Sequence, residues 1–209
     1  MKKIIIIFIL IIQFYSVELF SQNTHEFEMW YKVSPEIALT VNDRFDFRFR
    51  PCDYTVTPDV AKARLDFMAG VKFWKFTLFD YTKIDNHEGA WTGPRLDFNI
   101  MLANNKLLIH TNERFFFGLN SKSTNHYYLV QLVTWSFNDW FNAGFLGYGK
   151  WNTTTVFKEG LWFMGPIIGF KLPYNIEIQL STTIDIFDTK TYMSLFLLKY
   201  KIKYHKKEE

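Results

Sequence analysis

The longest alternation of polar and apolar residues lies in the C-terminal third of the chain, and it constrains the fold more than any other feature. Over residues 174–186 every second residue is polar or charged, and the residues between them are mostly isoleucine or leucine. Residues 192–204 repeat the alternation, with lysines on one face near the end. Because successive side chains of a strand point to opposite faces, both segments are predicted β-strands. Each exceeds the ~5–6 residues of an average globular strand and matches the ~9–11 residues of a tilted membrane-spanning strand.

The rest of the chain after the N-terminal segment shows the same two-residue period. The predicted strands are 26–33 (or on to 41), 43–51, 60–71, 74–84, 94–103, 106–118, 126–138, 140–150, 161–171, 174–186 and 192–204. Short turns are expected near 73–74, 103–105, 137–139 and 172–174, and they alternate with longer polar loops near 51–60, 85–93, 119–125 and 150–160. Short turns on one rim and longer loops on the other are typical of an outer-membrane barrel.

The N-terminus indicates export. Lys2 and Lys3 precede an apolar run from Ile4 to Ile12, and the small residue Ser21 follows at a suitable cleavage point, so residues 1–21 are a predicted signal peptide. A single-pass anchor is the alternative, but the apolar run is shorter than the ~20 residues that a bilayer helix needs. Cys52 is the only cysteine, which excludes an intramolecular disulfide, so packing or a membrane must stabilise the chain.

With these features, the mature chain resembles the small outer-membrane β-barrels of Gram-negative bacteria. The sequence Phe20-Ser21-Gln22 at the end of the predicted signal peptide resembles exported proteins of the Bacteroidota. The resemblance implies an all-β, antiparallel up-and-down transmembrane barrel in the cell outer membrane. Its implied partners are outer-membrane lipid and the barrel assembly machinery. The C-terminus departs from the pattern, because such barrels end on an aromatic residue and here Tyr204 is followed by five polar residues.

The predicted topology gives about ten strands. Single-chain bacterial barrels have even strand numbers, and placing the short turns on the periplasmic side makes 43–51 the first ascending strand. Residues 22–42 are then a pre-barrel segment or a first strand, 43–204 form the barrel, and 205–209 form a polar tail. Twelve strands would follow if 22–42 supplied two, and eight if two predicted strands were wrong.

A motif of arginine, an apolar residue, aspartate and phenylalanine occurs three times, at 44–47, 64–67 and 95–98. Each copy places Arg and Asp on one strand face and apolar residues on the other. In a membrane barrel the apolar face points to lipid, so Phe45, Phe47, Leu65, Phe67, Leu96 and Phe98 are expected outside and all six arginines inside. The predicted lumen charge network comprises Arg44, Asp46, Arg48, Arg50, Arg64, Asp66, Arg95, Asp97, His110, Asn112, Arg114, Glu177, Asp185, Lys199 and Lys201.

The turn at 103–106 sets the register of its two strands. It pairs Asp97 with Asn112, Asn99 with His110 and Arg95 with Arg114, and Arg114 is then expected to reach Asp97 diagonally. A second expected pair is Glu177 with Lys201. The mixed signs favour a lumen filled by paired charges over a selective ring. A narrow pore for small polar solutes is the functional alternative.

Other functions have weaker support in the sequence. An outer-membrane lipid esterase would need a serine held by a histidine, and the candidates are His110 with Asn112 and His126 with Ser121 or Ser123, none at a known motif spacing. The histidines are scattered and the glycines at 144, 147 and 149 lack a following helix, so neither a metal nor another cofactor is expected. No basic block in the folded region indicates nucleic acid binding.

A soluble secreted barrel that binds an apolar ligand would show the same alternation with its apolar face inward. Tryptophan positions separate the two architectures, because membrane barrels concentrate aromatic residues at both interfaces. Trp74, Trp135, Trp140, Trp151 and Trp162 all lie near predicted strand ends. This placement favours the membrane barrel.

Overall fold

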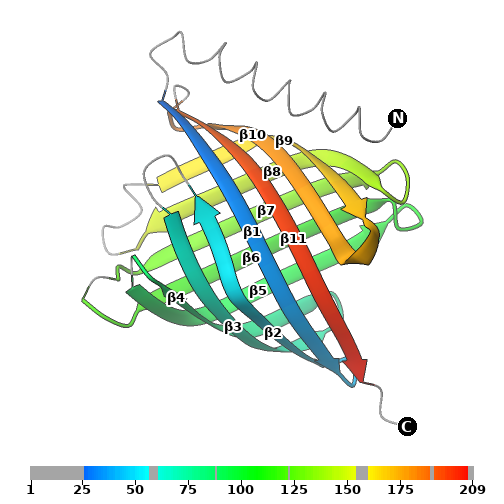
Figure 1. Ribbon diagram of the computed structural model, residues 1–209, viewed down its shortest axis with the longest axis horizontal. Coiled ribbons are helices and arrows are strands. Elements are labelled where there is room, and N and C mark those ends of the chain that lie inside the picture. Colours follow the sequence, from blue (N-terminus) through cyan, green and yellow to red (C-terminus); the bar gives the residue numbers. More distant parts are fainter. Residues whose placement is uncertain are drawn as a thin grey trace.

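The computed structural model describes residues 26–56, 61–87, 89–121, 123–153, 160–188 and 191–206; the predicted signal peptide lies outside them. The described chain forms eleven strands and one short 3₁₀ turn, η1 (Pro173–Asn175) (Figure 1). The strands are β1 (Glu26–Val41), β2 (Phe45–Val56), β3 (Ala61–Phe73), β4 (Phe76–Asp85), β5 (Gly89–Leu102), β6 (Leu107–Gly118), β7 (His126–Ser136), β8 (Phe141–Asn152), β9 (Gly160–Leu172), β10 (Ile176–Asp185) and β11 (Thr191–Lys206). No helix in this part of the chain is long and apolar enough to cross a membrane.

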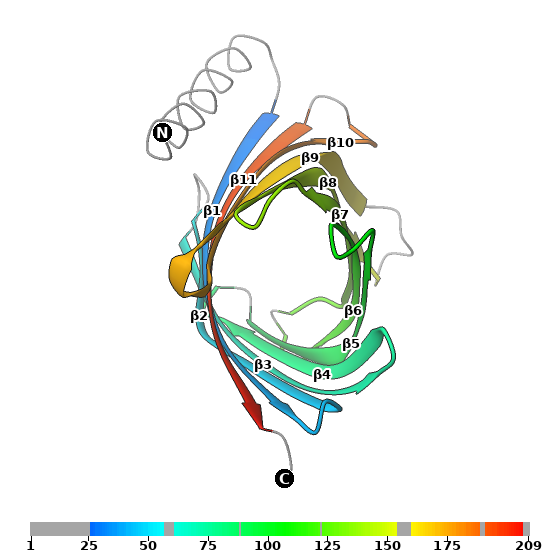
Figure 2. The ribbon, with the colours of Figure 1, turned by 90° about the vertical axis from the view of Figure 1, so that its right-hand side faces the viewer.

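The strands form one closed barrel, and Figure 2 looks into its open end. Consecutive strands are antiparallel, and the barrel closes through a parallel pairing of β1 with β11 that runs from Glu26 opposite Thr191 to Val41 opposite Lys206. The β1–β2, β3–β4, β5–β6, β7–β8 and β9–β10 connections therefore share one rim, the short-turn rim, and the others share the loop rim. Because of the parallel closure, Glu26 lies at the loop rim and Lys206 at the short-turn rim.

The all-β barrel predicted from the alternation is confirmed, but the predicted strand number of ten, with eight or twelve as alternatives, is wrong. Residues 26–41 form the first strand of the barrel, which is one of the two alternatives predicted for this segment. The even-number rule assumes that the first and last strands are antiparallel. Here β1 and β11 pair in parallel, so both edges are hydrogen-bonded in a barrel with an odd number of strands. Pro35, which has no backbone N–H, lies where the β1–β2 register shifts between Val33 and Ile37.

Two of the short turns have the geometry of tight hairpins. Asn42 and Asp43 both have positive φ, and the N–H of Arg44 donates to the carbonyl of Val41 at 3.1 Å. Asn104 and Asn105 make the equivalent turn, closed by a hydrogen bond from Lys106 to Ala103. Asparagine and aspartate tolerate positive φ better than most residues, which makes these sequences suitable for type I′ hairpin turns.

The two faces of the barrel are inverted relative to a soluble protein. On β3 the side chains of Asp66 and Met68 are 0% and 3% exposed. Phe67 lies between them and Val71 lies further along the strand, and their side chains are 47% and 48% exposed. Phe45 and Phe47 on β2 are exposed in the same way, as the motif predicts. Across the described residues, the buried side chains include 18 polar or charged and 13 hydrophobic ones. The polar residues of the alternating strands therefore point predominantly into the barrel.

Candidate functional site

One side of the barrel interior is lined by paired charges, and we call it the charged wall. It consists of inward side chains of β1, β2, β3, β5 and β6, which pair with one another or with β4 across the sheet. Its members are Lys32, Glu36, Asp46, Arg48, Arg50, Asp53, Arg64, Asp66, Arg95, Asp97, Asn112 and Arg114. Four of its carboxylates, those of Glu36, Asp53, Asp66 and Asp97, each contact two basic side chains.

Asp66 is the centre of the first group of contacts. Arg64 donates to it through Nε at 2.7 Å, the Tyr81 hydroxyl donates at 2.8 Å, and Arg50 lies at 3.5 Å. Arg50 also donates to Glu36 at 2.7 and 2.9 Å, and Lys201 of β11 contacts the same carboxylate. The network therefore extends across the β1–β11 closure.

Asp97 is the centre of the second group. Arg95 donates to both of its oxygens, at 2.7 and 2.8 Å, Asn112 donates to Oδ1, and Arg48 lies at 3.7 Å. The predicted register is confirmed, because Asp97 is opposite Asn112 and Arg95 is opposite Arg114. Arg114 donates to Asn112 Oδ1, however, so it connects to Asp97 through the amide and not by the direct diagonal contact expected.

The three motif copies differ in their surroundings. Arg64 with Asp66 and Arg95 with Asp97 pair within their own copies, as i and i+2 neighbours on the inner face. In the first copy Arg44 is exposed and lies in the β1–β2 turn before β2 begins, so it is not part of the buried charge network in which the sequence placed it. Asp46 pairs with Arg48 at 2.7 Å instead. Residues 42–44 form the hairpin turn, so β2 begins only at Phe45.

The remaining predicted network residues lie at other places in the interior. Glu177 is opposite Lys199, and both bind Gln179. The expected Glu177–Lys201 pair is wrong, because the parallel closure places Lys201 opposite Glu36. Asp185 is 2% exposed and accepts from the backbone N–H of Phe187 at 2.9 Å, so it shapes the β10 end. His110 Nδ1 lies 2.8 Å from Asn99 Oδ1.

A buried lysine that the sequence did not single out lies near the loop rim. Lys83 is 5% exposed, and its Nζ lies 4.2 Å from the ring centroid of Trp91, 4.4 Å from that of Phe116 and 5.2 Å from that of Tyr128. The three rings come from three other strands, so only the sheet order reveals them. Contacts with aromatic faces offset part of the desolvation cost of the ammonium group.

His126 completes this cluster. Its Nε2 lies 3.1 Å from Lys83 Nζ, and its Nδ1 lies 2.9 Å from the carbonyl oxygen of Thr124. Ser123 Oγ accepts from the N–H of Ala90 and donates to Asn120. The two ring nitrogens of His126 are thus engaged by groups other than a serine hydroxyl.

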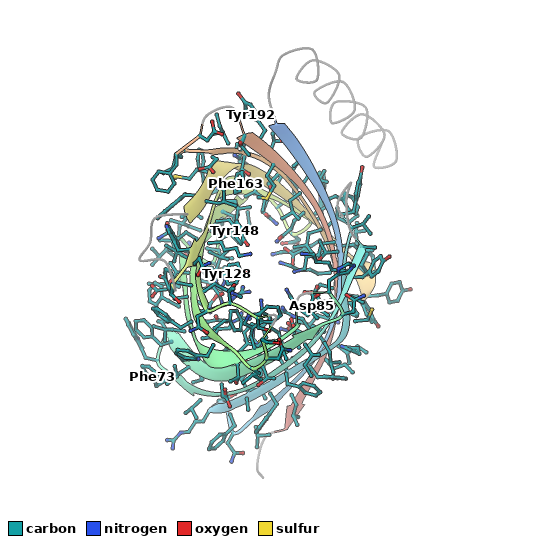
Figure 3. The ribbon with its side chains drawn as sticks, turned by 90° about the vertical axis from the view of Figure 1, so that its left-hand side faces the viewer. Phe73, Asp85, Tyr128, Tyr148, Phe163 and Tyr192 are labelled. Carbon is teal, nitrogen blue, oxygen red and sulfur yellow. The ribbon has the colours of Figure 1, made fainter. Side chains whose placement is uncertain are left out.

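The opposite side of the interior carries mainly apolar residues, and we call it the apolar wall. It consists of the inward side chains Val130, Leu132, Leu146, Tyr148, Phe163 and Ile167 of β7, β8 and β9. Figure 3 shows Tyr128, Tyr148 and Phe163 along one side of the barrel. The sequence predicted a polar lumen throughout, and β7 departs from that prediction because its residues 129, 130, 132 and 133 are all leucine or valine, so both of its faces are largely apolar.

Aromatic residues line the outer surface at both rims. Near the loop rim, Phe115, Tyr127, Trp151 and Trp162 contact one another in turn across β6 to β9, with centroid separations of 4.6, 5.4 and 5.2 Å. At the short-turn rim, Trp140 stacks on Phe170 at 6.2 Å. The five tryptophans predicted at strand ends are all at the rims, with Trp74, Trp135 and Trp140 at one and Trp151 and Trp162 at the other.

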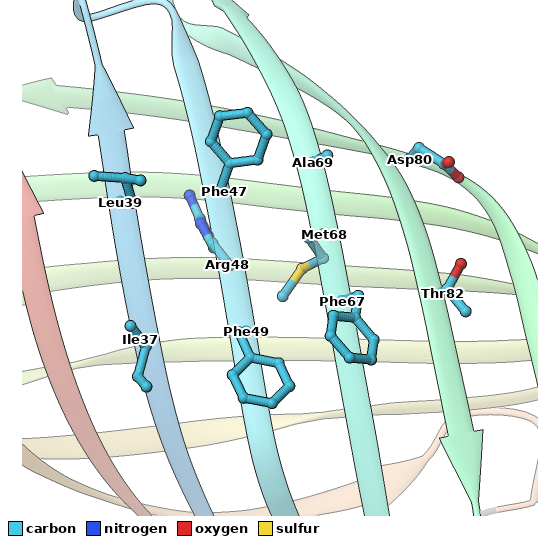
Figure 4. Close-up of a pocket in the computed structure, with 10 residues that line it drawn as sticks. All are labelled: Ile37, Leu39, Phe47, Arg48, Phe49, Phe67, Met68, Ala69, Asp80 and Thr82. Carbon is cyan, nitrogen blue, oxygen red and sulfur yellow. The ribbon is translucent and has the colours of Figure 1, made fainter.

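The outer surface also has a shallow groove of about 340 Å³ across β1 to β4 (Figure 4). Its apolar lining comes from Ile37, Leu39, Phe47, Phe49 and Phe67. Among the residues that the structure describes, no three His, Cys, Asp or Glu side chains gather as a metal site. Comparison with protein-family models, with curated proteins and with solved structures finds no match.

Proposed function

We propose that the protein is an outer-membrane β-barrel with a structural role, whose charged wall narrows the lumen to little or no passage for ions. The observation that carries the proposal is the inversion of the two faces: large apolar side chains are exposed outside while paired charges are buried inside. In water this arrangement would leave a hydrophobic surface far larger than monomeric soluble proteins expose. In a bilayer the same surface is solvated by acyl chains.

Three further features support a membrane location. The tryptophans lie at the two rims, where amphipathic rings favour the membrane interfaces. The groove of Figure 4 has the apolar character that an acyl chain would fill. The predicted signal peptide would export the chain, and outer-membrane lipid and the assembly machinery would be its partners.

The charged wall supports a structural lumen better than a selective pore. Arginines and carboxylates alternate along the charged wall, and side chains that bind these groups, such as Asp66 and Asn112, are fully buried. Ion selectivity would instead need a ring of one sign facing water. A lipid esterase remains the less favoured alternative, because the ring nitrogens of His126 contact Lys83 and Thr124.

The location is tested by separating soluble and membrane fractions of cells that express the full chain. We expect the mature protein in the outer-membrane fraction, with a gel mobility that changes on heating because the folded barrel resists detergent. A freely soluble mature protein with an ordinary mobility would refute the membrane barrel.

The role of the lumen is tested in planar bilayers. The purified protein is expected to show little or no steady conductance, and replacing Arg95 and Arg114 together by alanine is expected to raise it, because two long side chains leave the interior. Arg44→Ala is the matched control, since Arg44 lies exposed in a turn. Stable, ion-selective conductance of the unmodified protein would favour a pore instead.

A further inference from the structure

A row of cationic and phenolic side chains runs along the inner face from the charged wall to the strands of the apolar wall. The strand register places Arg95, Arg114, Tyr128 and Lys150 opposite one another in sequence on β5, β6, β7 and β8. Paired residues of adjacent strands share a face, so all four point inward. Tyr128 is the third residue of β7 and Lys150 the third from the end of β8, which places both near the loop rim.

Two of the three cations in this row differ from the third in their partners. Arg95 forms an ion pair with Asp97, whereas Arg114 donates to the neutral Asn112. Lys150 Nζ lies 5.7 Å from the Tyr128 ring centroid. In the part of the chain that the structure describes, neither Arg114 nor Lys150 forms an ion pair with a carboxylate. The row therefore holds positive charge that the charged wall does not neutralise.

The space in front of these cations is bounded by the apolar wall. Tyr128, Val130 and Leu132 point inward from β7 yet are only half-buried. Both edges of β7 are fully paired, so their exposed parts face the lumen. On the charged wall the partly exposed side chains are basic, such as those of Arg48 and Arg50. Apolar surface that faces the lumen therefore lies along β7, beside the half-buried Tyr148 and Lys150 of β8.

We propose that the barrel interior binds an amphiphile with a single acyl chain and an anionic headgroup, of the fatty-acid type. The headgroup would lie over Tyr128, between Arg114 and Lys150, whose strands are about 10 Å apart. Tyr128 and Tyr148, whose ring centroids are 6.0 Å apart, lie beside it. The chain would extend along Val130, Leu132 and Leu146 toward the short-turn rim, over about 20 Å of strand. This site does not depend on the membrane location proposed above.

The pairing of head and chain follows from the chemistry of the two surfaces. A carboxylate gains charge-assisted hydrogen bonds from guanidinium and ammonium groups, which are stronger than neutral ones and strengthened in a low-dielectric interior. An acyl chain covers valine and leucine side chains that otherwise face water. A small anion would leave the apolar wall uncovered, and a neutral lipid would leave Arg114 and Lys150 without a counter-charge.

The experiment measures binding of the fluorescent fatty acid cis-parinaric acid to the purified full-length protein in amphipol, or in plain buffer if the protein is soluble. We expect saturable binding that oleate displaces and oleoyl methyl ester does not. The double variant Arg114→Gln/Lys150→Gln is expected to weaken binding about tenfold or more, because two charge-assisted contacts are lost. Lys171→Gln, at the exposed short-turn end of β9, is the matched control and should leave the affinity unchanged.

A second variant and a second ligand keep the test decisive. Arg114→Lys retains the charge and is expected to recover most of the affinity lost in Arg114→Gln, which a defect in folding would not allow. Displacement by lysophosphatidic acid more strongly than by oleate would identify a phosphate headgroup at the same site. Equal displacement by oleate and its methyl ester, or unchanged affinity of the double variant, would overturn the proposal.

Discussion

The charged wall and the apolar wall use the same strand geometry but are held together differently. Asp66, on the charged wall, contacts two arginines and a tyrosine and is fully buried. Val130, on the apolar wall, is half-buried and faces the lumen without needing a polar partner. Buried charges are tolerated only when their partners are present, so each buried carboxylate of the charged wall needs its basic partners in place. Apolar side chains carry no such requirement, so the apolar wall can leave accessible space.

The charged wall and the apolar wall therefore have distinct roles in the barrel. The charged wall helps to fix strand order, because each shared carboxylate contacts at least one basic side chain of another strand. The apolar wall is free to line a binding space. Substitutions on the two walls and on the outer face test this difference.

The first prediction concerns the charged wall. Asp66→Ala would leave Arg64 and Arg50 without one carboxylate in a buried site, and breaking such a buried pair costs about 3–5 kcal/mol. The free energy of unfolding, measured by urea titration of the refolded barrel, is expected to fall by that amount. Asp43→Ala, in the exposed β1–β2 turn, is the control and should cost much less. A small loss in Asp66→Ala would mean that the network does not stabilise the barrel.

The second prediction concerns the outer face of the same strand. Phe67 is 47% exposed and adjacent to Asp66 in sequence. If its ring contacts lipid near the bilayer midplane, Phe67→Arg should lower the free energy of unfolding in vesicles by about 2–4 kcal/mol. If that ring faces water, the same change should cost almost nothing, because a surface charge is then solvated. Ile178→Arg on β10, four strands from β3 around the barrel, is expected to behave like Phe67→Arg.

The third prediction concerns the apolar wall. Val130→Thr introduces a hydroxyl of similar size that water in the lumen can reach, so it should cost only about 1 kcal/mol or less by urea titration. A loss approaching that of Asp66→Ala would show that the apolar wall is as tightly sealed as the charged wall. That result would remove the accessible space on which the proposed amphiphile site depends.

Much of this architecture was predictable from local patterns. The alternation in 174–186 predicts β10, and the Asn-rich turn at 103–106 sets the register that pairs Asp97 with Asn112, as the structure shows. The shared face of Arg64 and Asp66 follows from the two-residue period alone, and the membrane-barrel interpretation placed that face inside. In each case the relevant contacts lie on one strand or across one hairpin, so the sequence contains them directly.

The remaining features depend on contacts between distant strands. The parallel closure of β1 with β11 joins residues more than 160 positions apart, such as Glu36 and Lys201, and no local pattern encodes it. The position of Arg44 depended on where the first hairpin turns. The cluster around Lys83 draws on β4, β5, β6 and β7, so it appears only once the sheet order is known.

The most direct test of the inverted barrel is a scan of spin labels along β3 in vesicles. Single cysteines at Phe67, Met68, Ala69 and Val71 are labelled in a Cys52→Ser background, which removes the only native thiol. Collisions with lipid-soluble oxygen and with a water-soluble nickel chelate are then compared at each position. The membrane barrel predicts high oxygen and low nickel contact at positions 67, 69 and 71, and low oxygen contact at position 68. High nickel contact at positions 67 and 69 would place the apolar face in water and contradict the account.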